Sequence, residues 1–406
     1  MNENKVSELS TPELGQALTR LRSLKIALVH YWLLQMRGGE KVLEALCELF
    51  PSADVYTLFY DREGVSEPIR RARVTPSVLQ KLPGARRYYR NLLPFFPLAL
   101  EQFDLSSYDL VITSESGPAK GVVVPARTCH LCYCHTPMRY IWDMYHFYRD
   151  SGQGVLRRAA FGLIAHYLRQ WDLATANRVD FFAANSSTVQ ARIRKHYRRS
   201  SVVIPPPVDV NYFRPSSTVD DYYLFVGQLV SYKRVDLAIQ AFNSLGKPFV
   251  IVGEGPESGR LKKIAAANIK FMGHRPQQEL ADLYAHTRAV IMPNEEDAGI
   301  VPLEAQASGR PVIALGKGGV LDTVIEGETG MFFQEETAEG LIAAVKQFEA
   351  QSTRFLPARI RHHAEQFGQE QFKARMVGFI DDRWQRHQSR SRNINQKTAR
   401  AACQQT

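Results

Sequence analysis

Short apolar runs of strand length, each followed by a glycine-containing turn and a helical stretch, recur along this chain and constrain its fold most strongly. The pattern is clearest after residue 210, where Tyr223–Val226, Phe249–Val252 and Ala289–Met292 alternate with helical periodicity. Strands that alternate with helices predict parallel sheets built from crossover units. The fold class is therefore predicted to be α/β, and ligands are expected at the carboxyl ends of the strands.

Pro205–Pro207 is predicted to separate two such sheets, because three consecutive prolines fit neither a helix interior nor a central strand. We expect a polar leader over residues 1–24 with one weak helical stretch after Pro12, an N-terminal domain over 25–205 and a C-terminal domain over 206–365. Residues 386–406 hold five basic residues, no acidic residue and no apolar periodicity, which predicts a disordered basic tail. Strands of the first half are expected at Lys25–Val29, Asp54–Phe59, Asp109–Thr113, Lys120–Pro125, His130–His135 and Phe181–Ala184.

Positive charge is concentrated in the first half and the tail. The net charge is +10, and residues 1–210 carry 27 Lys and Arg against 19 Asp and Glu. Such a surface favours anionic partners, namely phosphorylated substrates, anionic lipid or nucleic acid. No apolar run is long enough to span a membrane, and residues 1–24 lack the apolar core of a secretory signal, so we expect a cytoplasmic protein. The five cysteines do not form a disulfide pattern.

Two glutamates eight positions apart form the strongest chemical motif. Glu296 follows an apolar strand, Glu304 lies in the next helix, and Gly299 and Pro302 stand between them. Pro302 suits the first turn of a helix, whose exposed amides attract anions. Carboxylates that accept bonds from sugar hydroxyls beside amides that hold phosphates would suit a nucleotide sugar. The alternative is that Glu296 caps the helix and Glu304 is a solvated helix residue.

The segment from Pro293 to Gly309 resembles the Glu-x7-Glu motif of the retaining glycosyltransferases of family 4, which have the GT-B fold. Further segments match in the same order. They are Phe225–Leu229 with Lys233–Asp236, Val252–Pro256, Phe271–His274, Gly309–Val312 and Gly318–Gly319. The resemblance covers essentially residues 25–385. It implies two Rossmann-like domains that face each other across a cleft, with a helix over 366–385 that crosses back to the N-terminal domain.

The resemblance implies roles for individual residues. Lys233 would hold the donor pyrophosphate, Glu304 the nucleotide ribose and Glu296 hydroxyls of the transferred sugar, while Gly273–Arg275 would lie by the base. One position departs from the family, which often has an arginine where this chain has Gln228; Arg234 is the candidate to replace it. The expected catalytic residues are His135, Glu296 and Lys233. The expected donor-binding residues are Gly38, Gly39, Gln228, Lys233, Arg234, Gly273, His274, Arg275, Glu296, Ala298, Gly299, Ile300, Val301 and Glu304.

The first half contains further candidate site residues, which would act together with this donor site. Gly38 and Gly39 follow the first strand, and in this family such a pair lets the backbone approach the leaving phosphate; otherwise a glycine pair marks only a turn. His135 ends a strand and resembles the family's histidine that contacts the transferred sugar; the alternative is a buried, hydrogen-bonded histidine. The segment Ser114–Lys120 follows a strand and is predicted to line the cleft. The alternative is that it forms only a turn capped by a serine.

The cysteine-rich strand over Cys129–His135 is not expected to bind a metal. Alternate residues of a strand face opposite sides, so Cys129 and Cys132 would point apart. No second Cys/His pair has zinc spacing. Buried, unligated cysteines are therefore predicted, and neither a metal nor another cofactor is expected.

Residues 68–100 contain seven Lys and Arg, no acidic residue and many aromatic and aliphatic residues. A basic stretch beside exposed apolar side chains would bind an anionic membrane surface, which suits a lipid-linked acceptor. A solvated helix face followed by core aromatics is the alternative. Nucleic-acid binding is a third interpretation, but no nucleic-acid-binding motif accompanies the charge.

The combined prediction is a cytoplasmic, membrane-peripheral, retaining and metal-independent hexosyltransferase. Residues Pro137–Asp143 resemble the bacterial mannosyltransferases that build O-antigen and exopolysaccharide, which suggests GDP-mannose as the donor and a lipid-linked or polysaccharide-precursor acceptor. A UDP-sugar donor is the first alternative. Two alternatives of other classes are a sugar-nucleotide epimerase of the same fold and a non-catalytic basic binding protein.

Overall fold

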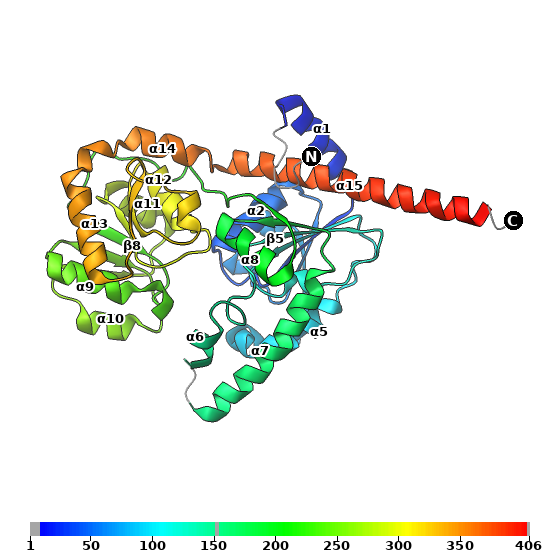
Figure 1. Cartoon of the computed structure of the whole chain (residues 1–406), viewed down its shortest axis with the longest axis horizontal. Coiled ribbons are helices and arrows are strands. Elements are labelled where there is room, and N and C mark those ends of the chain that lie inside the picture. The colour runs from blue at the N-terminus through cyan, green and yellow to red at the C-terminus, as the bar shows by residue number, and fades with distance from the viewer. Residues whose placement is uncertain (1–8, 151–153, 404–406) are drawn as a thin grey trace. The chain divides into compact units, whose positions relative to one another are not determined.

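The computed structural model describes residues 9–150 and 154–403, with the side chains of the last helix described to Arg390 and at Arg392. The chain forms two compact units. Unit 1 comprises residues 1–205 together with 372–406, and unit 2 comprises residues 206–371. The chain passes from one unit to the other at Pro205 and Pro206, within the proline triplet. In Figure 1, unit 1 runs from blue to green and ends in the red helix.

Unit 1 is built on a seven-stranded parallel sheet with the order β3-β2-β1-β4-β5-β6-β7. Its central strands are buried on both faces, which explains why they read as continuous apolar runs in the sequence. The strands are β1 (Ile26–His30), β2 (Asp54–Thr57), β3 (Arg73–Pro76), β4 (Leu110–Glu115), β5 (Cys129–Cys134), β6 (Phe181–Ala184) and β7 (Ser201–Val203).

Helices cover this sheet, and the last helix of the chain joins them. The α-helices are α1 (Thr11–Arg22), α2 (Gly38–Leu49), α3 (Glu67–Arg71), α4 (Ala85–Tyr88), α5 (Phe96–Glu101), α6 (Tyr145–Asp150), α7 (Val155–Ala176), α8 (Ser187–Tyr197) and α15 (Gln369–Cys403). Short 3-10 turns are η1 (Arg62–Gly64), η2 (Val78–Lys81), η3 (Tyr89–Phe95) and η4 (Ala119–Gly121). Phe372, Met376 and Ile380 of α15 pack into the same core as β1 and α2.

Unit 2 repeats the architecture with a six-stranded parallel sheet, ordered β10-β9-β8-β11-β12-β13. Its strands are β8 (Tyr223–Val226), β9 (Phe249–Val252), β10 (Ile269–Gly273), β11 (Val290–Met292), β12 (Val312–Leu315) and β13 (Gly330–Phe333). Its helices are α9 (Val235–Leu245), α10 (Ser258–Ile264), α11 (Gln277–His286), α12 (Ile300–Ala307), α13 (Ala338–Ala350) and α14 (Pro357–Glu365), with 3-10 turns η5 (Ser231–Lys233), η6 (Gly319–Asp322) and η7 (Ser352–Arg354).

The strand order determines where each unit can bind a ligand. In unit 1 the order reverses around β1, which has β2 on one side and β4 on the other; in unit 2 it reverses around β8, between β9 and β11. Loops that leave neighbouring strands in opposite directions open a crevice at their carboxyl ends. The candidate residues after β1, β4 and β5, and those after β8 and β11, lie at these two positions.

Two expectations about local structure were wrong, and one was confirmed. Residues Lys120–Pro125 contain no strand; instead η4 follows Pro118 and buries Lys120. The helical stretch expected in the leader is confirmed as α1, whose Ala17 and Leu21 are buried in the unit 1 core, while residues 1–8 lie outside the described part. The expected disordered tail continues α15 to Cys403, because residues 386–403 contain no proline or glycine and many helix-favouring residues. Residues 404–406 lie outside the described part.

No helix within the described residues is long and apolar enough to cross a membrane.

Candidate active site

The carboxyl ends of β8 and β11 bring Lys233 and Glu296 together. Lys233 ends the turn η5 after β8, and Glu296 lies in the loop between β11 and α12. The Lys233 ammonium donates to Oε1 of Glu296 and forms an ion pair with it, and the two side chains keep 17% and 14% of their surface exposed. Asn294 Nδ2 also donates to Glu296 Oε1, at 2.9 Å. A cation and an oriented carboxylate thus share one partly open site.

The loop around Glu296 depends on two glycines in the turn after β12. Gly319 donates its backbone N–H to the carbonyl of Glu296 at 2.8 Å. A Cβ at Gly318 would lie 2.3 Å from the Glu296 carbonyl oxygen, and one at Gly319 would lie 2.2 Å from that of Asp297. Gly318 also has a φ of +82°, which disfavours other residues. These glycines allow the backbone approach that fixes the position of Glu296.

Helix α12 begins beside this ion pair. Gly299 is its N-cap with a φ of +69° and has no side chain that could cap the helix. The amides of Gly299–Val301 lie in the first turn, at the helix end that favours anions. Ala298 is buried just before the helix.

Glu304 lies on the same helix with its carboxylate held in place. Tyr284 of α11 is fully buried and donates its hydroxyl to Glu304 Oε2 at 2.8 Å. Burial and the neighbouring Glu304 charge raise the pKa of Tyr284 well above its usual value, so this hydroxyl remains a donor. Glu304 is thus an oriented, half-buried carboxylate and not a solvated helix residue.

The remaining candidates of unit 2 border the same edge of its sheet. Gly273 ends β10 with a φ of +70°, and the backbone N–H of His274 donates to Glu254 Oε1 at 3.4 Å. Arg275 pairs with Glu279 at 3.3 Å. Gln228 is exposed after β8.

Arg234 has an uncommon backbone conformation. Its φ of +49° is one of two positive values among the described non-glycine residues. Its guanidinium pairs with Glu336 and lies 3.5 Å from Asp236. In the structure, Arg234 therefore interacts with carboxylates of its own unit. The expected role of Arg234, to replace the family's arginine at the position of Gln228, stays a prediction.

A second cluster, in unit 1, lies where β1, β4 and β5 end. Ser114 Oγ lies 2.9 Å from His135 Nε2 and 3.2 Å from His30 Nδ1, so one hydroxyl joins two histidines. The two imidazole rings stand edge to face with centroids 6.5 Å apart. Burial, with a smaller contribution from His30, lowers the pKa of His135 from 6.5 to about 3. His135 is therefore neutral near pH 7 and can both donate and accept a hydrogen bond.

The glycine pair lies against these histidines. Gly38 and Gly39 open α2, and a Cβ added at Gly39 would lie 2.6 Å from the Tyr31 hydroxyl and 3.5 Å from His135 Nε2. The atom that approaches Gly39 here is the Tyr31 hydroxyl, and the approach of a phosphate to the glycine pair stays a prediction. The sequence analysis missed Ser114 as the link between His30 and His135; the position of Ser114 at the end of an apolar run was the available signal.

The segment Ser114–Lys120 also contributes to a buried network of charged side chains. Glu115, Lys120 and Asp172 are fully buried, and the Lys120 ammonium pairs with both carboxylates. Burial raises the pKa of Glu115 to about 7, and the Lys120 charge opposes that rise. Asp172 also accepts from Trp142 Nε1 at 2.7 Å and from the Tyr197 hydroxyl at 2.9 Å. No feature of the sequence predicted that Asp172 and Trp142 belong to this buried network.

The cysteines of β5 are buried on opposite faces, as predicted. Cys129 belongs to the core that contains β1, and Cys132 and Cys134 pack against α8. Among the described residues, Cys129, Asp180 and His387 form a group whose potential ligand atoms all lie within 4.8 Å of one another. Burial raises the pKa of the Cys129 thiol, which favours the protonated form over the thiolate that a metal requires.

Comparison with known proteins identifies both units. Residues 36–212 match the family described as Glycosyltransferase Family 4, and residues 214–371 match the family described as Glycosyl transferases group 1. HepE of Anabaena in complex with UDP superposes with a TM-score of 0.67 at 17% identity, over 88% of this chain and 100% of that one. Each unit thus matches a glycosyltransferase family, and the chain has the two-domain α/β fold known as GT-B. The expected fold class is confirmed.

Curated relatives match these glycosyltransferase domains over shorter stretches. D-inositol 3-phosphate glycosyltransferase of Frankia alni is 32% identical over 160 residues, which cover 32% of this chain and 39% of the relative. Glycogen synthase of Mycobacterium tuberculosis is 34% identical over 135 residues, covering 30% and 32%. The chain thus spans 39% and 32% of the length of these two relatives. Neither is named as a mannosyltransferase.

Proposed function

We propose that this protein transfers a hexose from a nucleoside diphosphate sugar to an acceptor hydroxyl, with retention of anomeric configuration and without a metal ion. The ion pair of Lys233 with Glu296 at the start of α12 carries the proposal. It combines a cation and the amides of a helix N-terminus for a diphosphate with a carboxylate for sugar hydroxyls. HepE, which shares the fold, binds UDP, and the curated relatives are named for glycosyl transfer or glycogen synthesis.

The charges explain how such a transfer could proceed. As the glycosidic bond to phosphate breaks, negative charge grows on the leaving phosphate and positive charge grows at the anomeric carbon. Lys233 and the amides of Ala298–Val301 would stabilise the phosphate charge by preorganised electrostatics. An incoming diphosphate attracts the Lys233 ammonium, and Glu296 is then available to the sugar hydroxyls. The leaving phosphate would accept the acceptor proton on the same face, which gives retention.

The other candidates have supporting roles in this proposal. Glu304, oriented by Tyr284, would accept bonds from the ribose, and Gly273–Arg275 would lie by the base. Unit 1 would hold the acceptor. Its neutral His135 would hydrogen-bond the transferred sugar, and Gly38 and Gly39 would let the backbone reach a phosphate.

The donor is proposed from two different likenesses. The resemblance of Pro137–Asp143 to O-antigen and exopolysaccharide mannosyltransferases favours GDP-mannose, while the HepE complex favours a UDP-sugar. We retain GDP-mannose as the first donor to test and UDP-glucose as the second.

We further propose that a lipid-linked or polysaccharide-precursor acceptor is reached at an anionic membrane surface by residues 68–100. In this segment Val78, Leu82, Phe95 and Leu98 are between 43% and 63% exposed. Arg86, Arg87 and Arg90 are exposed beside them. Exposed apolar and basic side chains in one segment suit the interface of an anionic bilayer.

A thermal-shift titration tests the donor site. The chain is titrated with GDP, UDP, ADP and their common sugars, and the same series is applied to Lys233→Ala and to Lys346→Ala, an exposed lysine on α13. A ligand at 100 times its dissociation constant stabilises the folded state by about 2.7 kcal/mol. We expect one nucleotide series to raise the melting temperature of the wild type and Lys346→Ala but not of Lys233→Ala. An equal response of all three proteins, or none, would overturn the assignment of Lys233.

A further inference from the structure

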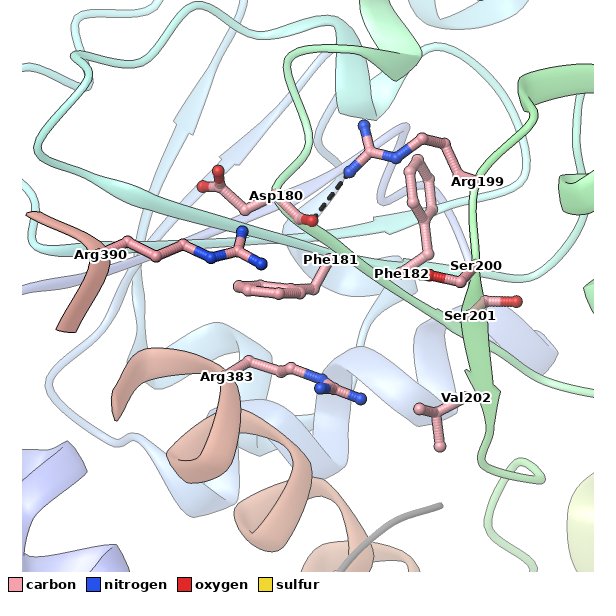
Figure 2. A pocket seen from close by; sticks show the side chains of 9 residues that line it. All are labelled: Asp180, Phe181, Phe182, Arg199, Ser200, Ser201, Val202, Arg383 and Arg390. Atoms are coloured by element: carbon pink, nitrogen blue, oxygen red, sulfur yellow. Dashed lines mark hydrogen bonds between the residues drawn. The ribbon is translucent and has the colours of Figure 1, made fainter. Parts of the chain in front are cut away.

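A pocket in unit 1 opens at the amino ends of β6 and β7 (Figure 2). Its volume is about 170 Å³, several times the ~30 Å³ that one water molecule occupies in the liquid. The lining residues come from β6, the loop into β7, and α15. They are Asp180, Phe181, Phe182, Arg199, Ser200, Ser201, Val202, Arg383 and Arg390.

The charge of this arginine pocket is positive. Arg199, Arg383 and Arg390 line it together with one carboxylate, that of Asp180. Arg199 donates to the backbone carbonyls of residues 176, 179 and 180, at 3.0, 2.6 and 2.8 Å, and carbonyls carry no formal charge. Asp180 also accepts from the backbone N–H of His130 at 2.8 Å and lies 3.8 Å from the His387 ring.

Two of the arginines are held in place by an aromatic ring. Arg383 and Arg390 are seven positions apart on α15 and therefore share one face of the helix. Their guanidinium carbons lie 5.4 Å and 5.6 Å from the centre of the Phe181 ring. Figure 2 shows the ring between the two guanidinium groups. Arg383 is buried and lies 3.2 Å from Asp382, a carboxylate that also pairs with Arg386.

The pocket is separate from the candidate active site of its own unit. It lies where β6 and β7 begin, whereas His135 and Ser114 lie where β5 and β4 end. In a parallel sheet these are opposite edges. The proposed transfer uses none of the three arginines.

We propose that the arginine pocket binds a phosphate group. Guanidinium groups match the geometry of phosphate oxygens and remain charged at all physiological pH values. Two of them come from α15 and the third, Arg199, from the loop into β7, and around a cavity of this size they form a cationic site that suits an oxyanion. Ser200, at the rim, adds a hydroxyl that can donate. The phosphate belongs either to a soluble ion or to a lipid headgroup.

Calorimetric titration of the full chain with inorganic phosphate and with pyrophosphate tests the proposal. The variants are Arg390→Glu, which reverses an exposed charge of the pocket, and Arg392→Glu, which reverses an exposed charge two positions along the same helix. Positions two apart do not share a helix face, so Arg392 is the matched control. We expect about tenfold or greater loss of phosphate affinity in Arg390→Glu and little change in Arg392→Glu. Lys233→Ala separates this site from the proposed donor site, because it should leave the phosphate affinity of the arginine pocket unchanged.

Three outcomes would overturn the proposal. They are absence of phosphate binding to the wild type, equal losses in Arg390→Glu and Arg392→Glu, and loss confined to Lys233→Ala. A second arm uses phosphatidylcholine vesicles with and without phosphatidic acid to identify the source of the phosphate. Stronger binding to the phosphatidic acid vesicles that Arg390→Glu reduces and Arg392→Glu does not would assign a lipid headgroup. Binding of soluble phosphate alone, with the same variant pattern, would assign a free ion.

Discussion

Lys233 and Glu296 are 63 positions apart in the chain, yet their charged groups are paired. Each side chain therefore sets the resting state of the other. If Glu296 serves the sugar and Lys233 the diphosphate, the loss of one charge should affect binding and transfer in different ways.

Glu296→Gln removes the carboxylate charge but keeps the shape of the side chain. We expect nucleoside diphosphate to bind at least as tightly as to the wild type, because Lys233 no longer has a competing carboxylate. Transfer should fall about 100-fold, since an interaction aimed at the reacting sugar is weakened. The measurements are nucleotide affinity and initial transfer rate. Glu295→Gln, at the exposed neighbour, is the control, and a parallel fall of nucleotide affinity and rate would contradict the assignment.

His130 should make unfolding depend on pH. It is fully buried, and burial lowers its pKa from 6.5 to about 4. Between these values the unfolded chain binds a proton that the folded chain does not, so His130 lowers stability as pH falls. Its contribution is at most about 1.4 kcal/mol per pH unit. Glu115, with its pKa raised to about 7, acts in the opposite direction, so the wild-type slope alone is not diagnostic.

The difference between wild type and His130→Gln isolates this contribution. Denaturant unfolding at pH 7 and pH 5 should show a larger loss of stability in the wild type than in the variant. Equal losses would mean that His130 does not titrate in this range.

At the scale of elements, the first turn of α2 holds a glycine, Gly39, that has a helical conformation and lies close to the Tyr31 side chain. A side chain at Gly39 would meet the Tyr31 hydroxyl, whereas Gly15 on α1 has no atom within 4 Å of an added Cβ. The same substitution therefore has two different expected effects.

Gly15→Ala should stabilise the chain by roughly 0.5–1 kcal/mol, because alanine loses less backbone entropy in a helix. Gly39→Ala has the same local advantage but must displace Tyr31 toward His30 and His135. We expect transfer to fall at least tenfold in Gly39→Ala while the unfolding midpoint changes little. Transfer rates and denaturant unfolding of both variants check this, and an unchanged rate in Gly39→Ala would remove the glycine from the proposed site.

The segment of residues 68–100 allows a test of membrane contact. Each basic residue near an anionic bilayer contributes about 1 kcal/mol, so the double variant Arg87→Glu with Arg90→Glu should lose at least about 30-fold in affinity for vesicles that contain phosphatidylglycerol. Lys262→Glu with Lys263→Glu, two exposed lysines of α10 in unit 2, makes the same charge change elsewhere. Vesicle sedimentation measures both. Equal losses in the two double variants would point to net charge instead of a specific surface.

Elements were predicted correctly where an apolar run in the sequence corresponds to a buried strand. The prediction failed where the apolar pattern and the burial in the structure differ. β1 and β4 are fully buried and begin with apolar runs, so they were recognised. β3 has no fully buried residue and ends in proline, and it was missed. Lys120 was placed in a strand because its neighbours are apolar; its burial depends on Asp172, 52 positions away, which no local pattern reveals.

For the whole molecule, α15 is the element that completes unit 1. Phe372, Met376 and Ile380 are buried in its core, and Arg20 of α1 donates to both carboxylate oxygens of Asp381, at 2.8 and 2.7 Å. Removal of these residues would expose the apolar side chains that they cover.

A chain that ends at residue 371 should therefore have a destabilised unit 1 and an intact unit 2. Limited proteolysis should cut the truncated chain between residues 25 and 205 and spare residues 206–371. A chain that ends at residue 392 keeps the buried part of α15 and should resist cleavage like the full protein. Equal resistance of all three chains would show that α15 adds nothing to unit 1.

The discontinuity of unit 1 also has a consequence for synthesis on the ribosome. Unit 2 is encoded by one uninterrupted stretch, whereas unit 1 needs residues from both sides of it. Unit 2 can therefore reach its native state while the last helix is still inside the exit tunnel. The core of the first 205 residues stays partly uncovered until α15 has left the tunnel. Although it is made first, unit 1 becomes native after unit 2, and this interval is when a chaperone would be of most use.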